Sequence, residues 1–118
     1  MSTDAQQLES AIQVAGKTAP RVTPADIEAE IVSEWYINAA DGVVPDADFH
    51  PPVPDRHPLR QLTFCVLVLQ NGYTVTGESA CASPENFDAE IGKRIARANA
   101  VAKIWPLLGF RLRDKLKG

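Results

Sequence analysis

The sequence predicts one α+β domain: an N-terminal helix, an antiparallel β-hairpin within a small sheet, and a long C-terminal helix followed by a short basic tail. Three observations lead to this prediction. They are a capped, apolar-periodic segment in residues 21–42, an Asn-Gly turn at residues 71–72 between two apolar runs, and a second capped segment from residue 83. A length of 118 residues fits a single domain, and 45% hydrophobic content supplies a modest core.

The segment RVTPADIEAEIVSEWYINAADG, residues 21–42, has the features of a helix start. Thr23 is a good N-cap, Pro24 suits the first helical position, and Asp26 lies in capping-box register. Apolar residues then recur at helical spacing, which predicts one helix that ends near Gly42. These apolar residues are Ile27, Ile31, Trp35 and Tyr36.

Two stretches on either side of this segment carry no sustained periodicity. Residues 1–20 are polar, and we expect a mobile arm ahead of a domain that spans residues 21–118. Residues 43–60 contain five prolines, which remove backbone donors and bias their predecessors away from helix. We therefore expect residues 43–60 to form a connecting loop.

The run QLTFCVLVLQNGYTVTGESAC predicts the hairpin. Asn71-Gly72 is typical of a two-residue type I′ turn, because both residues tolerate a positive φ. Pairing outward from this turn sets Leu69 opposite Thr74 and Val66 opposite Gly77. The strand 62–69 is apolar on both faces, so we expect it to be central in its sheet or covered by a partner.

Ser83 and Pro84 repeat the pattern of a helix start, and the helix is expected to end near Trp105, where Pro106 stops it. The predicted core face consists of Phe87, Ile91, Ile95, Ala98, Ala102 and Trp105. A second face carries the small residues Gly92, Ala96 and Ala100. This small-residue face allows close packing within the chain, pairing with a symmetry mate, or approach of a ligand.

Charge is divided unevenly along the chain, although the net charge is only −3. Residues 1–55 carry ten acidic and two basic side chains, whereas residues 56–118 carry ten basic and five acidic ones. The C-terminal half therefore faces an anionic partner or the acidic half of another copy, unless these are simply solvated surfaces. The overall negative charge argues against nucleic acid as the partner.

The second helix and the loop before it suggest an anion-binding site. Arg94 and Arg97, with Lys93 beside them, are suited to phosphates, although Glu90 and Arg94 also have the spacing of a solvated ion pair. Residues 78–86 would complement them with hydroxyls and with the free amides of a helix N-terminus. The predicted ligand-binding residues are Tyr73, Ser79, Ser83, Asn86, Phe87, Lys93, Arg94 and Arg97.

No residue pattern predicts catalysis or a metal. Cys65 and Cys81 with His50 and His57 have no compact zinc spacing, and the expected pairing points the two cysteines to opposite faces of the sheet. Phosphate-loop, dinucleotide and catalytic-serine motifs are absent from the sequence. We therefore expect a protein that is not an enzyme and that needs no cofactor.

The compartment follows from composition. The first ten residues lack the regions of a signal peptide, and no apolar run reaches the roughly 18–20 residues that span a bilayer. Two cysteines are too few for a secreted disulfide scaffold. We expect a cytoplasmic protein with no membrane contact.

From about Arg21 to Leu112 the chain resembles a family of small tailed-phage proteins, described as gene-49-like or gene-66-like. The blocks that carry the resemblance are RVTPADIEAEIVSEWYINAADG, LTFCVLVLQNGYTVTGESACASPENFDAEIGKRIA and KIWPLLGF. This resemblance implies a phage protein that works in the cytoplasm of the infected host; the family name carries no function of its own.

The order of a small sheet, a loop with Pro84-x-Asn86-Phe87-Asp88 and an arginine-bearing helix is also similar to phage anti-defence sponges. Sponges are oligomeric proteins that sequester cyclic nucleotide or cyclic ADP-ribose immune signals without cleaving them. The expected partners are thus a second copy of the chain and an anionic nucleotide-like molecule. Alternatives are a phage protein that inhibits a host protein and a nucleic-acid-binding accessory protein.

Overall fold

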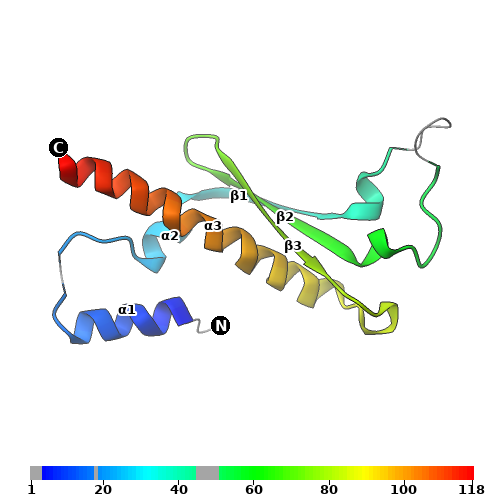
Figure 1. Ribbon diagram of the computed structural model, residues 1–118, viewed down its shortest axis with the longest axis horizontal. Helices are drawn as coiled ribbons and strands as arrows, with labels where there is room; N and C mark the ends of the chain where they lie inside the picture. Colours follow the sequence, from blue (N-terminus) through cyan, green and yellow to red (C-terminus); the bar gives the residue numbers. More distant parts are fainter. Residues whose placement is uncertain (1–3, 18, 45–50) are drawn as a thin grey trace.

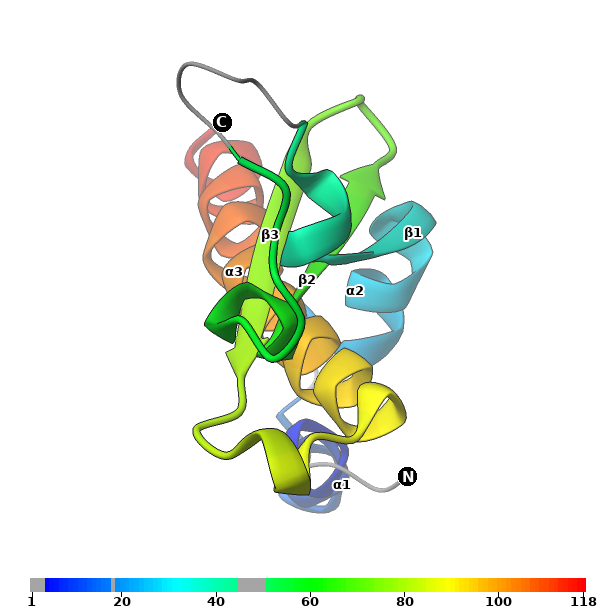
Figure 2. The ribbon, with the colours of Figure 1, turned by 90° about the vertical axis from the view of Figure 1, so that its right-hand side faces the viewer.

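The computed structural model describes residues 4–17, 19–44 and 51–118. Three α-helices and one three-stranded antiparallel sheet, in the order β1-β2-β3, confirm the α+β class. The long helix α3 (Ala89–Lys117) crosses one face of the sheet, and its C-terminal turns project past the β-hairpin (Figure 1). Figure 2 shows the same arrangement from the side.

Helix α2 (Pro24–Glu30) begins as predicted but is much shorter. Thr23 and Asp26 form a reciprocal capping box, with Pro24 in the first turn. The prediction of one helix up to Gly42 is wrong, because the chain turns at Glu30 into strand β1 (Ile31–Asn38) and then into a short 3₁₀ turn (Ala39–Gly42). The sequence IVSEWYIN is rich in β-branched and aromatic residues, and pairing with β2 satisfies its backbone along one edge.

The hairpin joins β2 (Leu62–Leu69) to β3 (Thr74–Ala80) with a register one residue away from the prediction. The Leu69 amide donates to the Tyr73 carbonyl at 2.8 Å, which leaves three residues in the loop rather than two. Gly72 takes the left-handed conformation at φ 86°, typical of a three-residue hairpin with a bulge.

This change of register alters which side chains share a face. Cys65 pairs with Gly77 and Leu67 with Val75, so Val75 lies on the same side of the sheet as Cys65 and Leu67. That side is buried beneath α3.

Helix α3 differs from the prediction at both ends. It is capped by Asp88 rather than Ser83, since Ser83 precedes a separate 3₁₀ turn (Pro84–Asn86). It also continues through Pro106 to Lys117. Proline removes one backbone donor, but Ile104 and Leu108 on either side are buried in the core, and their packing keeps the helix continuous.

The face of α3 that meets the sheet is the small-residue one. Its buried residues are Gly92, Ala96, Ala100, Ile104 and Leu108. The predicted core face is wrong at Ile91 and Ile95, which are 54% and 47% exposed, although Trp105 does pack against the core. Of the alternatives for the small residues, the structure shows packing within the chain.

The remaining segments frame this two-layer core. Residues 4–14 form helix α1 (Asp4–Val14), to which the sequence assigned no helix; it lies apart from the sheet (Figures 1 and 2). Whether residues 1–20 act as a flexible arm stays a prediction. Of the connector 43–60, residues 45–50 lie outside the described part. Residues 51–57 have no helix or strand, and a 3₁₀ turn (Pro58–Gln61) leads into β2.

Candidate functional site

The structure gathers most of the predicted ligand-binding residues at one end of the molecule. Ser83, Asn86 and Phe87 belong to the loop between β3 and α3, and Lys93 and Arg94 lie in the first turns of α3. Ser79 is half-buried near the end of β3. Tyr73 lies at the opposite end of β3, a seven-residue strand that spans about 20 Å. Within one chain, Tyr73 is therefore far from the other predicted ligand-binding residues.

The β3–α3 loop is held by its own polar contacts. The Ser83 hydroxyl donates to Glu85 at 2.9 Å, and the Cys81 thiol donates to the Ser83 carbonyl at 3.1 Å. The Glu85 pKa is lowered by hydrogen bonds from its own backbone and from Ser83. The Asn86 side chain is exposed beside these contacts.

The N-terminus of α3 already carries a carboxylate. One Asp88 oxygen accepts from the amides of Glu90 and Ile91 at 2.9 and 3.2 Å. The free amides were expected in residues 78–86, but the helix begins only at Ala89, and its first amides are occupied by Asp88. With Glu85 and Glu90 nearby, this helix end is not a ready anion site by itself.

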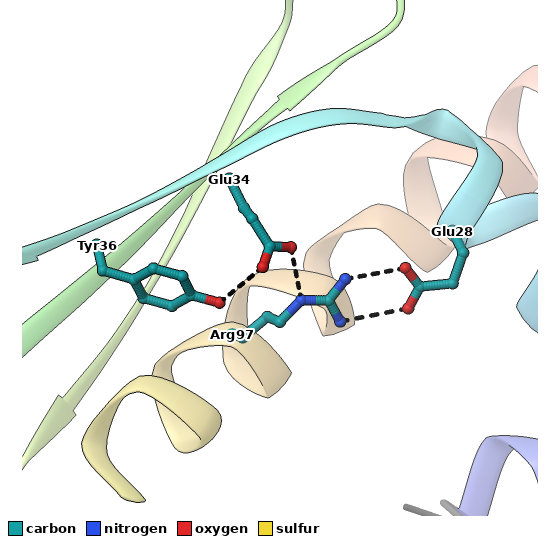
Figure 3. A network of polar contacts seen from close by, with 4 residues as sticks. All are labelled: Glu28, Glu34, Tyr36 and Arg97. Carbon is teal, nitrogen blue, oxygen red and sulfur yellow. Dashed lines mark hydrogen bonds and ion pairs between the residues drawn. The ribbon is translucent and has the colours of Figure 1, made fainter. Parts of the chain in front are cut away.

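Arg97 is committed to a network that joins three elements (Figure 3). Its guanidinium donates to both oxygens of Glu28 from α2, at 2.9 and 3.2 Å, and to Glu34 of β1 at 2.9 Å. The Tyr36 hydroxyl donates to the other Glu34 oxygen at 3.1 Å. This bidentate geometry fixes α3 against the edge of the sheet.

The pKa values of the network agree with this geometry. The hydrogen bonds from Arg97 lower the Glu34 pKa, and those to Glu28 raise the Arg97 pKa. Burial, together with Glu34, raises the Tyr36 pKa to about 12. Glu34 and Arg97 are therefore charged at neutral pH, with Tyr36 as a neutral donor.

The two cations next to Arg97 are more accessible. Lys93 Nζ lies 3.6 Å from Glu90 and 5.8 Å from the centroid of the Tyr36 ring. Arg94 is exposed and forms no ion pair with any described residue. Arg94 and Asn86 are thus the predicted residues most open to a ligand.

A second ion pair joins α2 to the C-terminal half of α3. Arg111 donates to both oxygens of the mostly buried Glu30, at 2.9 and 3.3 Å, and these bonds lower the Glu30 pKa. An open cleft of about 320 Å³ adjoins this pair. Its lining consists of Arg21, Val22, Asp26, Ala29, Glu30, Leu108, Arg111, Leu112 and Lys115. The two arginines of the cleft are already paired, Arg21 with Glu9 and Arg111 with Glu30. The cleft is therefore a place where salt bridges connect helices rather than a cationic binding site.

Metal-ligand chemistry has little support in the described part of the chain. No three His, Cys, Asp or Glu side chains gather there in a way that would hold an ion. Cys65 is fully buried, and burial raises the pKa of its thiol. Of the residues weighed for zinc, His50 lies outside the described residues. No described helix has the length and apolar character needed to cross a membrane.

The fold and this loop-and-helix end define a small two-layer α+β protein without a recognisable catalytic constellation among the described residues. A model of the Phage protein (N4 Gp49/phage Sf6 gene 66) family matches residues 22–116, and the chain belongs to this family. The family resemblance predicted from the sequence is confirmed. No curated protein and no solved structure matches the chain significantly.

Proposed function

We propose that this phage protein binds and sequesters a cyclic nucleotide or cyclic ADP-ribose immune signal in the host cytoplasm, without cleaving it. The observation that carries the proposal is the exposed Arg94. It has no ion-pair partner in the described chain and stands in the second turn of α3, the helix that follows the loop of Ser83, Asn86 and Phe87. A guanidinium in this position is suited to a phosphate, and the loop offers hydrogen bonds and an aromatic ring.

The roles within the site differ from residue to residue. Arg94 and Lys93 meet the phosphates, whereas Ser79, Ser83 and Asn86 donate or accept hydrogen bonds. Arg97 positions α3 through Glu28 and Glu34 instead of contacting the ligand, because its charge and a donor on each of its three nitrogens are already engaged by these two carboxylates. Tyr73 enters the site only from a second subunit.

Calorimetry against a panel of cyclic dinucleotides, cyclic trinucleotides and cyclic ADP-ribose tests this proposal. We expect at least one to bind and to be released intact on heating. Charge-assisted hydrogen bonds contribute about 1.5–3 kcal/mol, so Arg94→Ala should weaken binding by roughly tenfold to a hundredfold. Thermal stability should hardly change, since Arg94 holds no other element in place.

Arg113→Ala is the matched control, because it removes the same charge from the far end of α3 and should leave affinity unchanged. Arg97→Ala should instead lower the free energy of unfolding by about 1–2 kcal/mol, since it leaves two carboxylates without their cation. Absence of heat with every compound, or release of a hydrolysed product, would reject sequestration.

The outer face of α3 favours a second candidate, inhibition of a host protein. Ile91 and Ile95 lie on a flank of α3 outside its buried face, and Phe110 near its C-terminal end is 73% exposed. An apolar helix face of this kind is a common protein-binding surface. Capture of one defined host protein, lost in Ile95→Lys and kept in Arg94→Ala, would support this candidate over the first.

A further inference from the structure

The sheet face opposite α3 is open and apolar. Because β2 alternates, Cys65, Leu67 and Leu69 point to α3, while Phe64, Val66 and Val68 point the other way. The register places Trp35 beside Val66 and Ile37 beside Phe64 on this open face. Trp35 and Ile37 are 60% and 42% exposed. We call the side chains of Trp35, Ile37, Phe64, Val66 and Val68 the open face.

Antiparallel sheets with one solvated side normally place polar residues on that side. An apolar open face of this kind therefore indicates a surface that another protein surface covers. Its polar margin comes from Ser33 of β1, opposite Val68, and from β3, where Thr74 lies opposite Val68, Thr76 opposite Val66 and Glu78 opposite Phe64. Glu78 is the only charged residue on this side of the paired strands. A face without cations is unsuited to nucleic acid or to an anionic membrane.

The shape of the whole chain gives an independent indication of a missing partner. Its accessible surface is 8355 Å², whereas a compact monomer of this mass exposes about 6,300 Å². The radius of gyration is 18.3 Å, against about 13–14 Å for a compact domain of this length. Part of the excess belongs to α1, in which no residue is buried. The projecting C-terminal turns of α3 and the uncovered sheet face contribute as well.

We propose that a second copy of this chain covers the open face, so that two sheets pack face to face between two outer α3 helices. In a two-fold dimer each residue near the axis meets its own equivalent from the other subunit. A nearly uncharged face can therefore pack against a second copy of itself, whereas a charged face would repel its copy. A standard interface takes roughly 800 Å² from each partner, and the surface excess of about 2,000 Å², although α1 accounts for part of it, leaves room for a contact of that size. Paired sheets pack about 10 Å apart with interdigitating side chains, as aromatic and β-branched residues allow.

Light scattering of charge variants tests this dimer. Wild-type protein should have twice the mass of the 12.8 kDa chain. Trp35→Lys and Val66→Lys each place a lysine next to the same lysine of the second subunit. The two positive charges repel each other, so each variant should be a monomer with half the observed mass. Ile91→Lys, which places the same charge on the outer side of α3, should leave the dimer intact. Circular dichroism should show that all three variants stay folded, since none of these positions lies in the buried core.

Tryptophan fluorescence gives a second measurement, in which the residues of the open face remain unchanged. In Trp105→Phe, Trp35 is the only tryptophan left. Its emission should be blue-shifted and poorly quenched by acrylamide, and adding Val66→Lys should restore red, quenchable emission. A monomeric wild type, a dimer broken by Ile91→Lys alone, or a water-exposed Trp35 at all concentrations would overturn the proposal. Retention of a heterologous protein on a monomeric open face would assign that face to a host partner instead.

Discussion

Gly77 stands where strand β3 passes closest to helix α3. A Cβ at this position would lie 2.3 Å from both the Ala96 carbonyl oxygen and the Ala100 amide nitrogen. These are backbone atoms within a long helix, so neither can move aside alone. Close approach of the two backbones therefore requires glycine in the strand and alanines in the helix.

Gly77→Ala should accordingly lower the free energy of unfolding by about 3 kcal/mol or more, at the upper end of overpacking penalties. Urea denaturation followed by circular dichroism measures this change. Gly109→Ala is the matched control, because a Cβ there meets nothing within 4 Å. In the interior of a helix it should stabilise the protein by about 0.5–1 kcal/mol. Equal effects of the two substitutions would contradict the close approach.

Helix α1 is the element most weakly attached to the rest of the chain. None of its residues is buried, and an ion pair between Glu9 and Arg21 is one of its side-chain links to the body. A single ion pair of this kind contributes at most about 1 kcal/mol. The fold of residues 21–118 should therefore stand without it.

A chain that begins at Pro20 should keep its oligomeric mass and melt within about 4 °C of the full-length protein. Differential scanning calorimetry and light scattering measure the two properties. Glu9→Ala in the full chain should reproduce any small loss, because it removes the same ion pair. A larger drop in the truncated chain than in Glu9→Ala would show that α1 packs on a further surface.

At the scale of the whole molecule, two carboxylates tie α3 to the segment 24–38. Arg111 lowers the pKa of Glu30, and Arg97 lowers the pKa of Glu34, both from an ordinary value of 4.5. Since both folded-state pKa values are depressed, the stability that these pairs contribute is fully present above pH 4.5. It is lost as the pH falls through the folded-state values.

The free energy of unfolding should therefore decline on acidification below the ordinary glutamate range. Denaturation curves measured between neutral and strongly acidic pH test this expectation. Glu34→Gln should be less stable than wild type at neutral pH and should lose less stability on acidification, because one of the carboxyls with a depressed pKa is gone. An acid dependence as steep as that of wild type would exclude Glu34 as a contributor.

Local signals in the sequence predicted the features that depend on neighbouring residues. The Thr23 and Asp26 capping box, the hairpin around Asn71 and Gly72, and the existence of a long C-terminal helix all follow from contacts within a few positions. The α+β class and the family resemblance rested on these same stretches. The clustering of Ser83, Asn86, Lys93 and Arg94 was also predictable, because a short loop joins them.

Other features were decided only by tertiary contacts. The segment 31–38 has apolar residues at helical spacing, yet β2 supplies backbone partners that make it a strand. Packing against the sheet carries α3 through Pro106, and the backbone approach at Gly77 selects the small-residue face. The role of Arg97 was equally hidden, because Glu34 and Glu28 lie 63 and 69 positions away in the sequence. Short-range patterns determine where elements begin and turn, whereas the partner that each surface finds is set by contacts between distant segments.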